Sequence, residues 1–170
     1  MKKEASMGKI NLVRVDDRLI HGQVMTKWSK GLGTNALYVI DNETASDEFM
    51  KDIYINTNSS SGLKIQVYSN QEVVEKWNSD QFGKDNVVLL FKYIASVKEV
   101  VEQGLPVTRL NIGGVSKKGE AQFVIPTVAL TETDVDHLKS LDAKGIEIFF
   151  QTVPDSKKVP LMDGLKTIKK

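Results

Sequence analysis

The sequence contains no cysteine, and neither charge sign predominates. Without cysteine, disulfides, thiolate nucleophiles and cysteine-ligated metal sites are excluded, and a reducing compartment is favoured. Lysine and arginine number 23 against 22 aspartates and glutamates, so the formal net charge is only +1. No overall field therefore draws the chain to nucleic acid or to an anionic membrane surface, and binding must depend on local groups.

Long hydrophobic runs are also missing. The longest run, residues 87–91, is far shorter than the ~20 residues that a membrane-spanning helix needs. Polar residues follow Met1 where a secretion signal would place its apolar core. We therefore expect a cytoplasmic protein without direct membrane insertion. The length of 170 residues, 41% of them hydrophobic, predicts a single domain over residues 9–170 after a polar, disordered segment at 1–8.

Short apolar runs alternate with amphipathic segments along the chain. Strands are predicted at residues 10–15, 36–40, 63–67, 86–91, 108–112 and 146–150. The runs at 36–40 and 86–91 lack polar alternation, which is typical of strands buried on both faces. Apolar side chains with helical spacing lie between the strands, in five sets: Val24, Met25 and Trp28; Ala45, Phe49 and Ile53; Val73, Val74 and Trp77; Ile94, Val97 and Val101; Val135, Leu138 and Leu141.

This alternation predicts an α/β fold. Ser69 with Glu72, and Thr131 with Asp134, have the spacing of capping boxes at two helix starts. We expect an open, mostly parallel twisted sheet with helices on both faces. Residues 119–130 leave no room for a crossover helix, so they predict one short antiparallel excursion at a sheet edge.

The stretch "VDDRLIHG", residues 15–22, begins where the first predicted strand ends. Ligands of open parallel sheets bind beyond the carboxyl ends of the strands, so His21 lies where this fold class places its chemistry. Arg18 offers a planar charged fork for phosphate oxygens, and Gly22 allows close backbone approach. A neutral imidazole is a competent nucleophile. These features favour a phosphate-accepting histidine over an ordinary exposed His21 with Arg18 in a surface ion pair.

The segment "VRVDDRLIHGQV", residues 13–24, resembles the active-site segment of the IIB components of the mannose, fructose and sorbose family of bacterial phosphotransferase systems. The resemblance continues in "VIDNETASDEFMK" (39–51), "LNIGGVSKKG" (110–119) and "LTETDVDHLKSLDAKGIEIFFQTVP" (130–154). It implies that His21 is phosphorylated by a phosphohistidine on a IIA domain. It further implies transfer to a mannose-family hexose or N-acetylgalactosamine held by membrane IIC and IID components, with the chain associated peripherally with the inner membrane face.

The expected roles follow from phosphoryl transfer, in which positioning and charge stabilisation dominate. We expect His21 to act as nucleophile and carrier, and Arg18 to neutralise developing charge. Arg14 is either a second contributor or a structural ion-pair partner. Asp16 and Asp17 would repel phosphate if left bare, so one is expected to anchor Arg18 and the other to cap the following helix.

Other candidate sites are weaker. Gln23 either donates a hydrogen bond at the phosphate site or is simply solvated. "GVSKKG", residues 114–119, resembles the start of a nucleotide-binding P-loop, but Glu120 and Ala121 replace the required Lys and Ser or Thr, which argues against ATP binding. No cofactor or metal is expected, since two distant histidines without cysteine make a poor ligand set. His137 is predicted to be solvent-exposed on the polar face of its helix.

The paired glycines Gly113 and Gly114 are predicted to form a tight turn at the end of the strand at 108–112, in a loop that could also border the active site. Trp28 and Trp77 share the spacing of apolar neighbours and are predicted to be core residues.

Two further functional classes stay open. One is a non-catalytic regulatory or sugar-phosphate-binding domain of the same fold. The other is an unrelated histidine-nucleophile phosphatase, which would need a second arginine or histidine and an acid for the leaving group. The presence of His21, Arg18 and Gly22 together favours the phosphocarrier.

Overall fold

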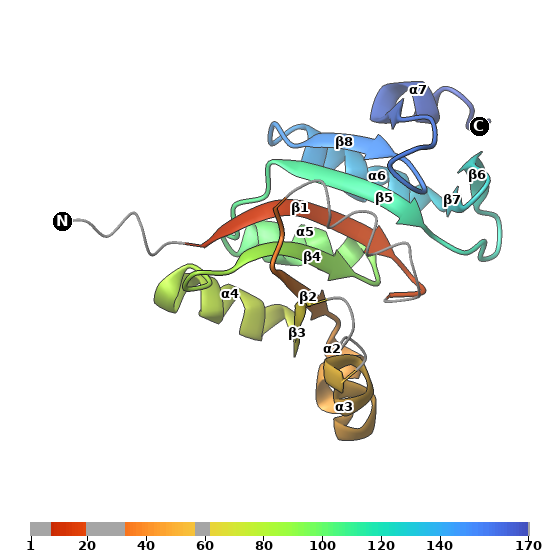
Figure 1. Cartoon of the computed structure of the whole chain (residues 1–170). Helices are drawn as coiled ribbons and strands as arrows, with labels where there is room; N and C mark the ends of the chain where they lie inside the picture. The colour runs from red at the N-terminus through yellow and green to blue at the C-terminus, as the bar shows by residue number, and fades with distance from the viewer. Residues whose placement is uncertain (1–7, 20–32, 57–61, 170) are drawn as a thin grey trace.

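A seven-stranded sheet in the order β3-β2-β4-β1-β5-β8-β9 forms the centre of the molecule (Figure 1). The computed structural model describes residues 8–19, 33–56 and 62–169. The strands of this sheet are β1 (Lys9–Asp16), β2 (Ala36–Ile40), β3 (Lys64–Tyr68), β4 (Asn86–Phe91), β5 (Arg109–Gly114), β8 (Glu147–Phe150) and β9 (Val159–Pro160). Every pairing is parallel except that of β9 with β8. The predicted mostly parallel sheet is confirmed.

Helices cover both faces of the sheet, as predicted. They are α2 (Asn42–Ser46), α3 (Glu48–Asn56), α4 (Asn70–Asp80), α5 (Ile94–Glu102), α6 (Glu132–Asp142) and α7 (Leu161–Leu165). Side chains such as Val15, Leu89 and Ile112 share a core cluster with buried residues of α4, α5 and α6. Side chains on the other face of the sheet, including Leu90, pack in a second cluster with Tyr54 and other residues of α2 and α3.

Two helix starts form by the local chemistry that the sequence predicts. At α4, Ser69 Oγ accepts a bond from the Glu72 amide at 3.0 Å, and the Ser69 amide donates to Glu72 at 2.8 Å. At α6, Thr131 and Asp134 make the same reciprocal pair, both at 3.0 Å. Each box satisfies amides that have no partner within the helix.

The predicted helix face of Ala45, Phe49 and Ile53 is wrong in two respects. The segment is divided at Asp47, whose carboxylate accepts bonds from the amides of Phe49 and Met50 and so starts a new helix. Phe49 and Ile53 are exposed, and it is Tyr54 and Ile55 of α3 that pack on the core. The helix predicted around Val24, Met25 and Trp28 lies outside the described residues.

The region 119–130 contains the predicted antiparallel excursion. Strands β6 (Gln122–Ile125) and β7 (Val128–Leu130) pair antiparallel, but they make a two-stranded sheet of their own. A parallel bridge between Val115 and Val128 connects this pair to the end of β5. The antiparallel strand at the edge of the main sheet is β9.

The first described residue, Gly8, is buried, and its amide donates to the carbonyl of Gln81 at 3.1 Å. Residues 1–7 of the predicted disordered segment lie outside the described residues. Among the described helices, none combines the length and apolar character required to cross a bilayer. Trp77 packs edge-to-face on Phe82 at 4.9 Å between ring centroids, in agreement with its predicted core role.

Candidate functional site

The candidate site begins at the carboxyl end of β1, in the centre of the sheet between β4 and β5. Asp16 ends the strand, and the Leu19 amide donates to the Asp16 carbonyl at 2.8 Å, closing a turn. His21, Gly22 and Gln23 lie outside the described residues. Arg14, Asp16, Asp17 and Arg18, however, are all described.

Arg14 is completely buried. Its guanidinium donates to the carbonyl oxygens of Gln151 at 3.2 Å and Thr152 at 3.0 Å, and to the side-chain oxygen of Asn111. Its Nη2 also donates to Asp16 Oδ2 at 3.0 Å. Burial lowers the pKa of Arg14, and the neighbouring Asp16 carboxylate opposes that shift. These contacts correspond to the structural ion-pair alternative for Arg14.

Asp16 is the shared acceptor of the site. Its carboxylate accepts bonds from Arg14 and from three groups of Arg18: Nε at 2.9 Å, Nη2 at 2.9 Å and the backbone amide at 3.1 Å. Burial alone would raise the pKa of Asp16, but the bonds from Arg18 and the charges of both arginines outweigh it and lower the pKa. Asp16 is therefore the aspartate that anchors Arg18.

Arg18 extends from this buried pair toward solvent, with 43% of its side chain exposed. The hydrogen bond to Asp16 raises the pKa of Arg18, so its positive charge is constant over the working pH range. The next residue, Leu19, is buried and has a φ of +55°, a conformation that non-glycine residues seldom adopt. Strain of this kind concentrates at functional sites, and nothing in the sequence indicates it here.

Asp17 makes contacts that the sequence does not predict. Its amide donates to the carbonyl of Gly114 at 2.9 Å. Its carboxylate accepts a hydrogen bond from the amide of Ser116 at 2.7 Å, so the side chain connects the end of β1 to the segment after β5. The helix it was expected to cap lies outside the described residues.

Gly113 and Gly114 do not form the predicted tight turn, because both lie within β5 and neither has a positive φ. Their role is close packing. A Cβ on Gly113 would overlap the Arg14 guanidinium, and one on Gly114 would lie 2.5 Å from Asp16 Oδ1. Sequence reasoning missed this role, although two adjacent small residues ending a strand are compatible with close approach as well as with a turn.

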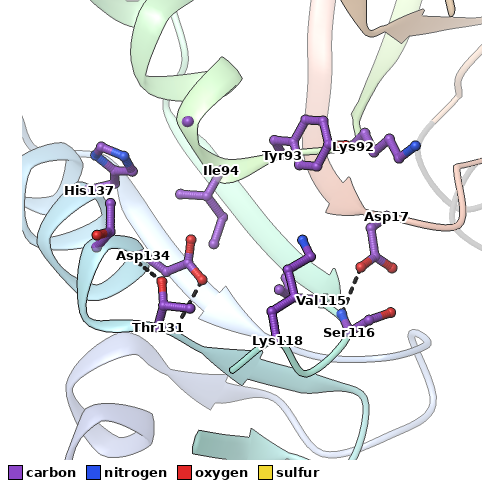
Figure 2. Close-up of a pocket in the computed structure, with 12 residues that line it drawn as sticks. Asp17, Lys92, Tyr93, Ile94, Val115, Ser116, Lys118, Thr131, Asp134 and His137 are labelled. Carbon is purple, nitrogen blue, oxygen red and sulfur yellow. Dashed lines mark hydrogen bonds between the residues drawn. The ribbon is translucent and has the colours of Figure 1, made fainter. Parts of the chain in front are cut away.

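A cavity of about 230 Å³ lies beside Asp17 (Figure 2). The segments after β4 and β5 and the first turns of α5 and α6 line it, and Lys92, Tyr93 and Lys118 are among its residues. The lysine Nζ atoms lie 5.6 Å and 5.4 Å from the centroid of the Tyr93 ring. His137 also lines the cavity and is half-buried, so its predicted exposure is only partly correct.

Comparison with known proteins identifies the family. The model of the PTS system sorbose subfamily IIB component matches residues 10–170. The chain belongs to this family of phosphotransferase-system IIB components. The mannose-specific EIIAB component of Escherichia coli (strain K12) is 33% identical over 162 residues, which cover 95% of this IIB chain and 50% of that relative. The chain thus spans about half the length of this curated relative.

Solved structures agree with this assignment. The crystal structure of manxB from Thermoanaerobacter tengcongensis has a TM-score of 0.89 and 39% identity, covering 97% of this IIB chain and 99% of that one. The IIBSor domain of the sorbose permease from Klebsiella pneumoniae has a TM-score of 0.87 and 28% identity, covering 95% and 98%. Both cover nearly the whole of each chain, so the fold is that of the IIB family.

Proposed function

We propose that this chain is the phosphocarrier component of a sugar phosphotransferase system. His21 accepts a phosphoryl group from the phosphohistidine of a IIA domain and passes it to a sugar held by membrane IIC and IID components. The observation that carries the proposal is the position of Arg18, three residues before His21 in a chain of the IIB family, with its guanidinium anchored by Asp16. The sugar is a mannose-family hexose or N-acetylgalactosamine.

The chemistry is two successive displacements at one phosphorus atom. An imidazole nitrogen of His21 attacks, the bond between phosphorus and the donor imidazole breaks, and the donor histidine leaves with the electron pair. In the second step a sugar hydroxyl attacks the phosphorus and gives up its proton to solvent. The bond from phosphorus to His21 breaks, and the imidazole nitrogen leaves with the electron pair. Arg18 stabilises negative charge on the equatorial oxygens in both steps, which is the main contribution that a protein makes to such a transfer.

The neighbouring residues support these steps in distinct ways. Gly22 allows the backbone to approach the phosphoryl group, and Gln23 adds a hydrogen-bond donor. Asp17 fixes the adjoining segment after β5 through Ser116. Arg14 acts from within the sheet without touching phosphate. We also propose that the chain associates peripherally with the inner membrane face by binding the permease.

Phosphorylation in vitro tests the proposal, and the chain provides its own control because it has only two histidines. The general phosphotransferase proteins, phosphoenolpyruvate and a cognate IIA domain should place acid-labile phosphate on the wild type. His21→Ala should acquire none, whereas His137→Ala should be labelled like the wild type. Label on His21→Ala would contradict the assignment of the carrier.

The regulatory alternative makes the opposite prediction in the same experiment. A domain that has lost the transfer would remain unlabelled even when the IIA domain is demonstrably phosphorylated and several IIA donors of the family have been tried. In that case the phosphocarrier proposal would have to be withdrawn.

A further inference from the structure

We infer that Gly113, Gly114 and Arg14 are positioning residues that fix the guanidinium of Arg18 for phosphoryl transfer. The inference deepens the proposed function and rests on it. None of the three is placed in contact with phosphate. They act by determining where the carboxylate of Asp16 can lie.

The first step concerns Gly114. Asp16 of β1 is paired with Gly114 of β5, after a shift in register between Val15 and Asp16. A Cβ on Gly114 would lie 2.5 Å from Asp16 Oδ1 and 3.2 Å from Arg18 Nη2. Oδ1 is the atom that accepts hydrogen bonds from both Nε and the backbone amide of Arg18. Any side chain at position 114 would therefore displace the acceptor on which Arg18 depends.

The second step concerns Arg14 and Gly113. The buried guanidinium of Arg14 lies against Gly113, where a Cβ would overlap it. Its bonds to Asn111 and to the carbonyl oxygens of Gln151 and Thr152 fix it to β5 and to the segment that follows β8. Arg14 Nη2 and Arg18 Nη2 then share the same Asp16 oxygen, Oδ2. The second carboxylate oxygen is thus fixed from the sheet side.

The consequence is a guanidinium presented in one orientation. Arg18 engages Asp16 through Nε and Nη2, and among the described residues no partner is recorded for its Nη1. The edge of the guanidinium with Nε and Nη2 is anchored to Asp16, and the edge with Nη1 is available to a ligand from the solvent side. The charges also matter, because Arg18 shares the carboxylate of Asp16 with Arg14, and Asp17 acts on it from the other neighbouring position. Arg18 therefore brings a permanent positive charge to an incoming phosphoryl group at a site whose net charge is close to zero.

The test is Gly114→Ala, measured as the single-turnover rate of phosphoryl transfer from phosphorylated IIA. We expect the rate to fall about tenfold to a hundredfold, as for a displacement of about 1 Å in a positioned group. Gly8→Ala is the control for crowding away from the site, because a Cβ there would overlap the carbonyl oxygen of Asp85 and lie 2.8 Å from that of Gln81, beside the amino end of β1. That variant should transfer at the wild-type rate.

A double-mutant cycle separates positioning from general structural damage. In an Arg18→Gln background, Gly114→Ala should change the rate by less than about twofold, because the group it displaces is already gone. An equal loss in both backgrounds would overturn the inference, as would a folded Gly114→Ala that transfers like the wild type.

A measurement independent of transfer covers the remaining cases. The Nε–H resonance of Arg18 in the NMR spectrum should shift in Gly114→Ala and stay unchanged in Gly8→Ala. Should Gly114→Ala fail to fold, Asn111→Ala loosens Arg14 without adding atoms and should shift the same resonance and slow transfer. An unchanged resonance in the folded variants would refute the positioning role. A wild type that acquires no phosphate would instead refute the proposed function.

Discussion

The carboxylate of Asp16 accepts bonds from two arginines and a backbone amide, although it has no access to solvent. A buried charge is tolerated only when opposite charges and hydrogen bonds surround it. Removing the charge of Asp16 would leave the buried positive charge of Arg14 beside Arg18 without the negative charge that now balances it. The residue is therefore important for stability as well as for the site.

This balance predicts the effect of Asp16→Asn. We expect the free energy of unfolding at neutral pH to fall by about 3–5 kcal/mol, as when one partner of a buried pair is removed. Denaturant unfolding measures the change. Asp163→Asn is the control, since its contact with Lys166 is exposed and 3.8 Å long, and it should change stability by less than about 0.5 kcal/mol. Similar losses in both variants would contradict the role of Asp16.

The pH dependence of stability follows from the direction of the pKa shift. The pKa of Asp16 is lowered in the folded state, so its stabilisation is complete above the ordinary aspartate value of about 3.9 and is lost as the pH falls through the folded-state value. The stability difference between wild type and Asp16→Asn should therefore shrink below about pH 4. A difference that stays constant down to pH 2 would argue against the shift.

At the scale of elements, capping side chains predict where a helix starts. Apolar spacing is a less reliable predictor of which helix face is buried. The capping boxes of α4 and α6 lie at the predicted residues. The predicted face of Phe49 and Ile53 failed because Asp47, another capping side chain, divides the segment. A cap acts between residues two or three positions apart, so its effect is nearly independent of the rest of the fold.

The cap of α4 provides a prediction at this scale. Ser69→Ala should lower the free energy of unfolding by about 1 kcal/mol, because the Glu72 amide loses its partner. Ser79→Ala is a suitable control, since Ser79 is exposed in the same helix and its hydroxyl donates to the carbonyl of Lys76 without capping the helix. It should change stability by less than about 0.5 kcal/mol. Thermal or urea unfolding would reveal the contrast, and equal losses would contradict the capping role.

At the scale of the whole molecule, one sheet separates two apolar layers. The layer that packs on α4, α5 and α6 and the layer that packs on α2 and α3 share the same strands, because successive residues of β1, β2 and β4 point to opposite faces. Unfolding of these strands would therefore expose the apolar side chains of both layers to water. The single domain over residues 9–170 stays a prediction, which unfolding can test.

A single domain predicts one cooperative unfolding transition. Tryptophan fluorescence, to which Trp77 of α4 contributes, should follow the same urea curve as far-ultraviolet circular dichroism, which reports all helices. Two curves with clearly separated midpoints would show that parts of the chain unfold independently.

Local sequence patterns predict the alternation of strands and helices, the two capping boxes, the parallel sheet and the position of the histidine segment after the first strand. These properties depend on periodicity and on contacts within a few residues. It takes the assembled fold to show that Arg14 is buried, that Asp16 anchors Arg18, and that Gly113 and Gly114 make room for this network. Arg14 meets Asn111 across 97 positions, and Asp17 meets Ser116 across 99. Such contacts depend on β1 lying beside β5, an order of strands that no local pattern specifies.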